Sequence, residues 1–151
     1  MVNLKEINKD NIDDVLSLKV SDNQKRFVIS NAQSLAKAYV YSKTAYPFAV
    51  YDDETLVGFI MMGYYEVKGY YTLWEFMIDQ KYQNKGYGRQ ALNLGIKFVK
   101  DTFNPDSIYT GVTPGNAVAK GLYESVGFVS TGLIELGMEE MKLSLKNEND
   151  H

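Results

Sequence analysis

A polar loop with two glycines runs directly into a long helix-forming segment just past the middle of the chain. The loop reads Gln83-Asn84-Lys85-Gly86-Tyr87-Gly88, and residues 86–103 have enough apolar positions for a mostly buried helix. Glycines let backbone N–H groups approach an anion closely, and the N-terminus of a helix carries a partial positive charge. Lys85 and Arg89 add positive charge. The segment therefore predicts a site for a phosphate-bearing ligand such as a pyrophosphate, although a tight loop before a helix would need the same glycines.

Two nucleotide-binding patterns fit this segment less well. Gly86-Tyr87-Gly88-Arg89-Gln90-Ala91 satisfies G-x-G-x-x-A, the dinucleotide-binding pattern. That pattern requires a strand abutting the first glycine and an acidic residue at the end of the next strand. Here the seven polar residues 79–85 separate strand and glycine, and Asp106 precedes its predicted strand. A nucleoside-triphosphate P-loop is excluded because Lys85-Gly86 is not followed by Ser or Thr.

The order of the predicted elements indicates an α/β (α+β) fold, with a mixed central sheet of about six to seven strands and helices on both faces. Ser34 is the expected N-cap within the second helix. We expect a single domain over residues 1–145 and a charged tail over 146–151. The predicted strands are 2–7, 46–51, 56–65, 70–78, 107–112, 128–135 and 139–145, and the predicted helices are 11–20, 27–41, 86–103 and 116–125.

The composition of the chain limits which residue types can transfer protons or bind a metal ion. The chain has no cysteine and one histidine, His151, so a Ser-His-Asp triad and a Cys or His metal site are excluded. Acid–base steps must therefore use Asp, Glu, Tyr or Lys. A net charge of −3 argues against broad nucleic-acid binding and favours a small cationic partner. Without a long apolar run or a signal peptide, we expect neither a membrane span nor export, and hence a cytoplasmic protein.

Two stretches in fixed order are more specific than the glycines alone. Residues 78–88 contain the pattern R/Q-x-x-G-x-G/A, and residues 116–128 match N-x-x-A-x-x-L-Y-x-x-x-G-F. Together they resemble the acetyl-CoA motif and the second hallmark of the GNAT superfamily of N-acetyltransferases. The stretches 18–24, 27–28, 34–36 and 56–64 resemble the bacterial spermine/spermidine acetyltransferases. The resemblance implies an acetyltransferase that takes acetyl-CoA as co-substrate, uses no metal, and acetylates a small amine such as a polyamine.

The resemblance also implies a cofactor site. In the family two central strands splay apart, here 70–78 and 107–112, and the pantetheine arm bonds to the backbone of Phe76, Met77 and Ile78. The N–H of Met77 is the expected oxyanion-hole donor. The pyrophosphate is expected on the N–H groups of Gln83, Asn84, Lys85, Gly86, Tyr87, Gly88 and Arg89, with a further CoA contact from Asn116. One departure is that the family often has Arg where this chain has Gly121, with Lys at position 120 instead.

Glu75 and Tyr123 are the candidate catalytic residues. By family position, Glu75 would take a proton from the amine and Tyr123 would protonate the departing thiolate. Strand alternation predicts Glu75 on the face of Leu73 and Met77, opposite Trp74 and Phe76. The plainer alternatives are an exposed strand carboxylate and a core tyrosine. Glu75 also counts as a substrate contact.

The sequence is compatible with further substrate-binding carboxylates and with other functions. Asp22 lies in the polyamine-like stretch 18–24 and is the only further carboxylate that we assign to substrate binding. Other possible carboxylates are Glu66 and residues 52–54, of which 52–54 read as a solvated turn. Alternative functions are acetylation of another amine, such as an antibiotic, an amino acid or a protein N-terminus, and a non-catalytic acetyl-CoA sensor. A homodimer is expected only because many relatives form one.

Overall fold

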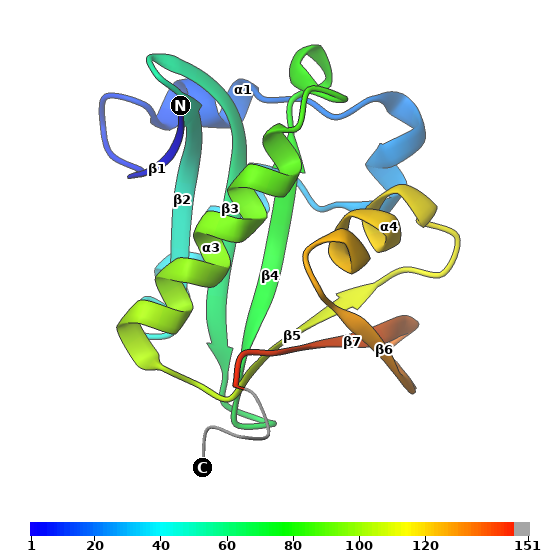
Figure 1. Ribbon diagram of the computed structural model, residues 1–151. Coiled ribbons are helices and arrows are strands. Elements are labelled where there is room, and N and C mark those ends of the chain that lie inside the picture. The colour runs from blue at the N-terminus through cyan, green and yellow to red at the C-terminus, as the bar shows by residue number, and fades with distance from the viewer. Residues whose placement is uncertain (147–151) are drawn as a thin grey trace.

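The computed structural model describes residues 1–146 as a seven-stranded sheet with helices on both faces (Figure 1). The strand order is β1-β2-β3-β4-β5-β7-β6, and β4 with β5 is the parallel pair among antiparallel neighbours. The strands are β1 Val2–Glu6, β2 Ala45–Asp52, β3 Thr55–Tyr65, β4 Tyr70–Ile78, β5 Ser107–Val112, β6 Val129–Glu135 and β7 Met138–Ser144; the helices are α1 Ile12–Ser17, η1 Asp22–Phe27, α2 Asn31–Val40, η2 Gln80–Tyr82, α3 Tyr87–Phe103 and α4 Ala117–Ser125.

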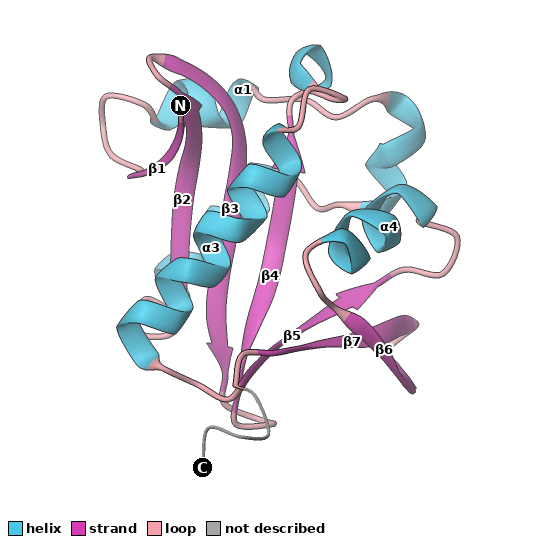
Figure 2. Cartoon of the chain, viewed as in Figure 1, coloured by secondary structure: helices cyan, strands magenta, loops and turns pink. Residues whose placement is uncertain are grey.

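Two apolar clusters, one on each face of the sheet, hold the layers together. The α3 cluster joins α3 and α4 to one face and includes Leu73, Leu92 and Tyr123. The α2 cluster joins α1 and α2 to the other face and includes Phe59 and Met77. Figure 2 shows α3 lying along the near face of β2, β3 and β4, and α4 beside β5. The mixed sheet and its two helical layers confirm the predicted fold class.

The N-terminal helices differ from their predicted bounds. The second helix begins at Asn31, and its N-cap is Ser30, whose side chain accepts a hydrogen bond from the N–H of Gln33. Ser34, the predicted cap, is 1% exposed and lies inside the helix. Residues 22–27 form a 3₁₀-helix with no buried residue. Ser30 is the cap because its backbone is extended there, as capping requires, and Ser34 is already helical.

A β-bulge interrupts β4 at Trp74. Met61 and Met62 are adjacent on β3, yet they pair with Glu75 and Leu73 on β4, so Trp74 is the extra residue. The Trp74 ring packs against the α2 cluster and covers Gly63, where a Cβ would lie 2.5 Å from the ring. Close approach of this ring to the backbone therefore requires glycine at position 63.

The central parallel pair separates after three residue pairs. Tyr71, Thr72 and Leu73 of β4 pair with Ile108, Tyr109 and Thr110 of β5, and the pairing ends there. The Thr110 hydroxyl donates to the carbonyl oxygen of Leu73 at 3.2 Å, which holds the strands together at the last pair. Beyond it, residues 74–78 of β4 face an opening instead of a neighbouring strand. The predicted splay of these two strands is confirmed.

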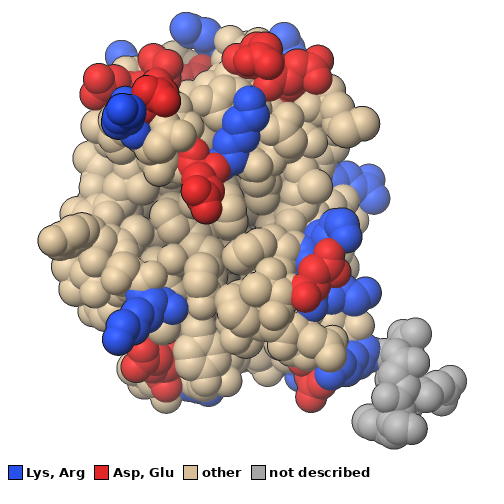
Figure 3. All heavy atoms as spheres, turned by 90° about the vertical axis from the view of Figure 1, so that its left-hand side faces the viewer, with Lys and Arg blue, Asp and Glu red and all other residues tan. Residues whose placement is uncertain are grey.

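The surface of the protein carries charges of both signs. Figure 3 shows acidic and basic side chains interspersed on the face that lies to the left in Figure 1, with no continuous basic surface. No helix within residues 1–146 is long and apolar enough to cross a membrane. Of the predicted tail, Lys146 forms an ion pair with Asp106 (2.9 Å), and residues 147–151 lie outside the described residues.

Candidate active site

A cleft of about 1180 Å³ opens where β4 and β5 separate. Its walls come from five places in the chain: the open edge of β4, the first turn of α3, one side of α4 with the loop before it, the segment around η1, and the β6–β7 turn. Among its lining residues are Gln24, Arg26, Phe27, Lys37, Tyr70, Trp74, Glu75, Phe76, Met77, Ile78, Gln83, Asn84, Gly86, Gly88, Arg89, Thr110, Asn116, Tyr123, Glu135 and Glu140.

The register of β4 decides which backbone groups face this cleft. The N–H of Asp79 donates to the carbonyl of Val57 on β3 at 2.8 Å. In an antiparallel ladder the hydrogen-bonded pairs recur every two residues. The backbone N–H and C=O of Met77 are therefore directed at its partner Phe59 on β3. The backbone N–H and C=O groups of Phe76 and Ile78 then point away from β3. In agreement, the Ile78 carbonyl accepts a hydrogen bond from the side chain of Gln83 at 2.9 Å. The amide groups that face the cleft are therefore those of Phe76 and Ile78, and not the predicted N–H of Met77.

The N-terminus of α3 forms the second wall. Gly86 is its N-cap with a φ of 86°, no side chain caps the helix, and Asn84 before it has a φ of 63°. The first N–H groups of an α-helix have no partner within the helix, so here they remain available to an anion. At Gly88 a Cβ would lie 3.1 Å from Leu122, so this glycine lets α3 approach α4 closely. Asn84, Gly86, Gly88 and Arg89 all line the cleft.

Glu75 lies on the α2 side of the sheet. Leu73 and Phe76 pack with the α3 cluster, whereas Trp74 and Met77 pack with the α2 cluster. The bulge therefore places Glu75 on the face of Trp74 and Met77, which corrects the predicted partnership with Leu73. Burial raises the pKa of Glu75 to about 7, and the nearby ammonium of Lys37 opposes the rise. A carboxyl with this pKa can exchange protons near neutral pH.

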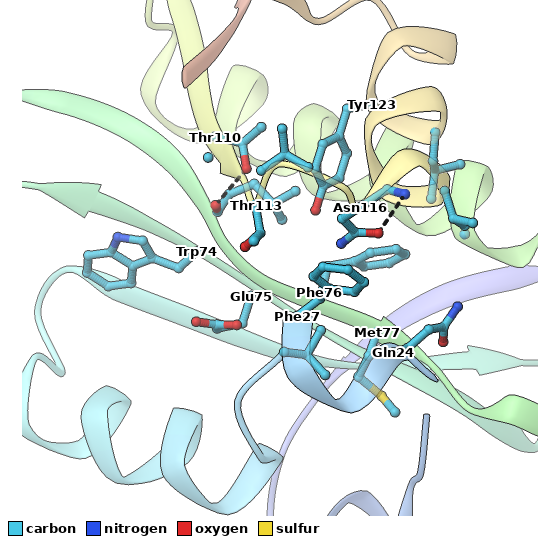
Figure 4. Close-up of a pocket in the computed structure, with 18 of the residues that line it drawn as sticks. Gln24, Phe27, Trp74, Glu75, Phe76, Met77, Thr110, Thr113, Asn116 and Tyr123 are labelled. Atoms are coloured by element: carbon cyan, nitrogen blue, oxygen red, sulfur yellow. Dashed lines mark hydrogen bonds between the residues drawn. The ribbon is translucent and has the colours of Figure 1, made fainter. Parts of the chain in front are cut away.

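Tyr123 lies on the other face, in the α3 cluster. It is 9% exposed, and its ring packs against Phe128 with centroids 6.0 Å apart. Burial, and secondarily the charge of Glu75, raises the pKa of the Tyr123 phenol to about 12. Figure 4 shows the hydroxyl pointing from α4 toward the strand that carries Phe76. Within residues 1–146 this hydroxyl has no hydrogen-bond partner, so it can donate to a molecule in the cleft.

The opposite end of the cleft combines tyrosines and carboxylates that the sequence did not single out. Glu140 of β7 accepts from the Tyr70 hydroxyl (3.5 Å) and from the Thr131 hydroxyl (3.0 Å). The ammonium of Lys68 pairs with Glu135 and lies 3.6 Å from Glu140. Because the β3–β4 and β6–β7 turns are about 70 residues apart in sequence, no local pattern could have indicated their contact.

Comparison with known proteins decides the family. Residues 12–128 match the model of the acetyltransferase (GNAT) family. The chain belongs to the GNAT acetyltransferase family. It is 31% identical over 148 residues to the spermine/spermidine N(1)-acetyltransferase of Bacillus subtilis (strain 168), covering 93% of this chain and 95% of that one.

Solved structures share the fold of this GNAT acetyltransferase. Spermidine N-acetyltransferase from Vibrio cholerae, in complex with CoA and spermine, has a TM-score of 0.75 at 19% identity over 95% of both chains. A PaiA N-acetyltransferase from Thermoplasma acidophilum, in complex with coenzyme A, has a TM-score of 0.73 at 15% identity, over 95% of this chain and 99% of that one. The splayed sheet and the cleft between β4 and β5 are thus set in a fold that these enzymes also have.

Several residues assigned from the sequence lie outside the cleft of this acetyltransferase. The Tyr87 hydroxyl donates to Asp52 at 2.6 Å, and Lys85 lies 6.0 Å from the centre of the Tyr82 ring. The side chain of Asp22 is 96% exposed and pairs with Lys25 at 2.9 Å, so η1 turns it toward solvent. Lys85, Tyr87 and Asp22 are therefore not among the residues that line the cleft.

On α4, two positions bear on the departure from the family pattern. Lys120 pairs with Glu139 at 3.1 Å and does not line the cleft. Gly121 lines the cleft with open space around its missing Cβ.

Asn116 caps α4 by accepting from the N–H of Ala119 at 3.3 Å, which leaves its side-chain NH₂ free to face the cleft. Among residues 1–146, no three His, Cys, Asp or Glu side chains gather as a metal site would require.

Proposed function

We propose that this acetyltransferase transfers the acetyl group of acetyl-CoA to a primary amine of a polyamine by direct attack on the thioester. The observation that carries the proposal is the arrangement of the cleft around the β4–β5 opening. An unpaired strand edge and a helix N-terminus lie at one end, a carboxylate and a phenol flank the middle, and carboxylates with tyrosines lie at the far end. The names of the curated relatives support the polyamine as acceptor.

The residues present fit a CoA molecule. A pantetheine arm carries amide groups, and the backbone amides of Phe76 and the N–H of Ile78 offer it the partners that a longer β5 would have used. The pyrophosphate fits the unpaired N–H groups at the start of α3, with Arg89 beside them. Bound in this way, acetyl-CoA would supply the activated acetyl group as its thioester.

The positions of Glu75 and Tyr123 fit the two proton transfers of direct attack. An alkyl amine with a pKa near 10.4 is protonated at neutral pH, and holding it neutral at pH 7 costs roughly 4–5 kcal/mol. Glu75 takes a proton from the attacking nitrogen, whose lone pair forms the bond to the carbonyl carbon. The carbon–sulfur bond then breaks, the Tyr123 hydroxyl protonates the sulfur, and the second proton that the acylated nitrogen loses restores the Tyr123 phenol through solvent. The N–H of Phe76 or Ile78 is the proposed donor to the carbonyl oxygen.

The far end of the cleft supports an acceptor with more than one ammonium group. Tyr70, Thr72 and Trp74 lie along β4 between Glu140 and Glu75, and five residues of strand span about 15 Å. An extended tetra-amine such as spermine has a comparable length of about 16 Å, given bonds of about 1.5 Å. Its ends could then pair with Glu75 and Glu140, while a short diamine could reach only one of them.

Two cations in the same half of the cleft favour a second candidate. Arg26 and Lys37 both line the cleft, and Lys37 acts on the charge of Glu75, so a purely cationic acceptor would be repelled by both. An amine that also carries a carboxylate, such as an amino acid or a peptide N-terminus, would be attracted by them. This candidate keeps the same acetyl transfer and changes only the acceptor.

A panel of amines separates these acceptors. Purified protein is mixed with acetyl-CoA and with spermine, spermidine, putrescine, butylamine, lysine or an aminoglycoside, and thiol release is followed. The polyamine proposal expects the highest kcat/KM for spermine and spermidine. If lysine or a peptide reacts faster, the second candidate replaces it. If no amine releases thiol while calorimetry shows CoA binding, the chain is an acetyl-CoA sensor.

We also propose that the protein self-associates through its edge strand β6. A spermidine N-acetyltransferase from Vibrio cholerae is described as dodecameric. Here the edge strand β6 is exposed along its whole length, with Val129 64% and Ile134 65% exposed, and such an edge can pair with a second copy of the chain. Light scattering on the purified protein, with Ile134→Lys as the disrupting variant, measures whether a dimer forms through this edge.

A further inference from the structure

The segment that forms the acceptor wall of the cleft, residues 19–27, has no buried residue, and within it only Val20 packs against an apolar cluster. Val20, Gln24, Arg26 and Phe27 line the cleft, yet none of the six residues of η1 is buried. Several of its bonds are local, such as those of Ser21 Oγ with Asn23 and of Lys25 with Asp22. A wall of this kind needs an anchor elsewhere if it is to present a defined surface to the amine.

That anchor is the loop that leads from β4 to α3. The N–H of Lys19 donates to Asp79 Oδ2 at 2.9 Å, and the carbonyl of Lys19 accepts from the N–H of Gln80 at 2.7 Å. Further along, the side chain of Gln83 donates to Gln24 Oε1 at 2.9 Å. The same Gln83 nitrogen lies 2.9 Å from the Ile78 carbonyl on the open edge of β4. The acceptor wall is thus bonded at its first residue, Lys19, and again at Gln24 to the loop on the CoA side of the cleft.

Asp79 is the centre of this arrangement. It is 6% exposed, its own N–H is bonded to Val57 of β3, and its second oxygen, Oδ1, accepts from the N–H of Lys81 at 2.9 Å. The two carboxylate oxygens therefore each accept from one backbone N–H, one in the acceptor wall (Lys19) and one in the loop that leads to α3 (Lys81). An amide at this position has a single acceptor oxygen and presents an NH₂ group to the other N–H, so it can serve only one of the two.

We propose that Asp79, with the Gln24–Gln83 contact, positions the acceptor wall relative to the CoA-binding loop, so that the amine is aligned with the acetyl group. Asp79 lines neither the proposed amine site nor the CoA site, and it acts through residues 19–27. The inference rests on the proposed acetyl transfer for its kinetic consequence. The bonding between the two segments stands apart from any turnover.

The test compares Asp79→Asn and Gln24→Ala with Asp101→Asn, an exposed aspartate on α3 that pairs with Lys97. We expect Asp79→Asn to raise the KM for the amine about 3- to 10-fold, and Gln24→Ala about 2- to 5-fold, because each loses a hydrogen bond or two. The Kd for CoA, measured by calorimetry, should change less than about twofold. Asp101→Asn should match the wild type in both measurements.

Hydrogen exchange gives a second readout that needs no turnover. In Asp79→Asn the backbone amides of residues 19–27 should exchange faster than in the wild type, while those of α3 keep their protection. If exchange over residues 19–27 and the amine KM are unchanged in both variants, or if CoA affinity falls as much as amine affinity, the inference is wrong. Should Asp79→Asn fail to fold, Gln24→Ala decides alone. A wild type that acetylates no amine contradicts the proposed function, and the exchange experiment still tests the anchor.

Discussion

Glu75 and Tyr123 lie on opposite faces of the sheet, at the point where β4 and β5 separate. Glu75 is on the α2 side with Trp74 and Met77, and Tyr123 is on the α3 side with Phe128. In a tetrahedral intermediate the entering nitrogen and the leaving sulfur occupy different positions around the same carbon. A carbonyl held in the opening between the strands would have the base on one side and the acid on the other, as the proposed reaction requires.

Tyr123→Phe removes the proposed acid and leaves the ring in place. We expect kcat to fall about 100-fold or more, because a positioned proton donor contributes about 10²- to 10⁴-fold. The Kd for CoA should stay the same, since the ring packing is kept. Thiol-release kinetics and calorimetry measure the two quantities, and Tyr109→Phe, at a tyrosine stacked on Tyr70, is the control. A parallel loss of CoA affinity would instead indicate a packing role.

The pH profile tests Glu75. Its pKa of about 7 means that the carboxylate form, which accepts the proton, increases as the pH rises from 6 to 8. We expect kcat/KM to rise through this range, and to rise further as the amine itself loses its proton. Glu75→Gln should lower kcat/KM about 10- to 100-fold and remove the limb near pH 7. Glu54→Gln, in the exposed β2–β3 turn, should keep the limb.

Glu75 should also affect stability, with a definite sign. A carboxyl whose pKa is raised by folding holds its proton more tightly when folded, so ionisation opposes folding. The penalty is absent below the ordinary pKa of 4.5, grows up to pH 7 and is full above it. Glu75→Gln should therefore be more stable than the wild type at pH 8, by at most about 3 kcal/mol, since the open cleft screens part of the charge. Denaturant unfolding at pH 4 and pH 8 checks this, and an equal difference at both would contradict it.

Lys68 places an alkyl ammonium where the distal end of a polyamine is proposed to bind. Lys68→Met removes this internal competitor from Glu135 and Glu140. We expect the kcat/KM ratio of spermine to butylamine to rise about 2- to 10-fold, because a hydrogen bond made possible in this way contributes about 0.5–1.5 kcal/mol net. Glu140→Gln should lower the same ratio. Lys97→Met, which removes an exposed ion pair on α3, is the control. If the spermine-to-butylamine ratio changes in neither Lys68→Met nor Glu140→Gln, the distal ammonium binds elsewhere.

Gly63 should be essential to the bulge. A methyl group at this position would lie 2.5 Å from the Trp74 ring, so Gly63→Ala forces the ring or the strand to move. We expect a loss of about 1–3 kcal/mol in unfolding free energy, together with lower kcat, since Glu75 follows Trp74 directly. Gly121→Ala, at a helical position with open space, should instead gain up to about 1 kcal/mol. Equal effects of the two substitutions would argue against the close contact.

Much of the fold and part of the site could be read from the residues. Gly86 and Gly88 indicated a loop that opens a helix toward an anion, and the structure has Gly86 at a φ of 86° as the N-cap of α3. The order of strands and helices along the chain followed from the residue patterns, the splay of β4 from β5 followed from the resemblance, and both are confirmed. Tyr123 and Glu75 both line the cleft. The bounds of α2 and the orientation of Asp22 were not readable, because several serines and acids in that stretch could have served equally well.

Local patterns determined what depends on local chemistry: a positive φ at a glycine, a helix that follows it, and alternation along a strand. The tertiary structure alone decided the bulge at Trp74, and with it the face of Glu75, because a bulge arises from pairing with β3 and leaves no mark in the strand's own residues. It also decided which amides of β4 are free, and it brought Lys68 to Glu140 and Lys19 to Asp79. These relations join residues about 60 to 70 positions apart, and only the packed sheet brings them together.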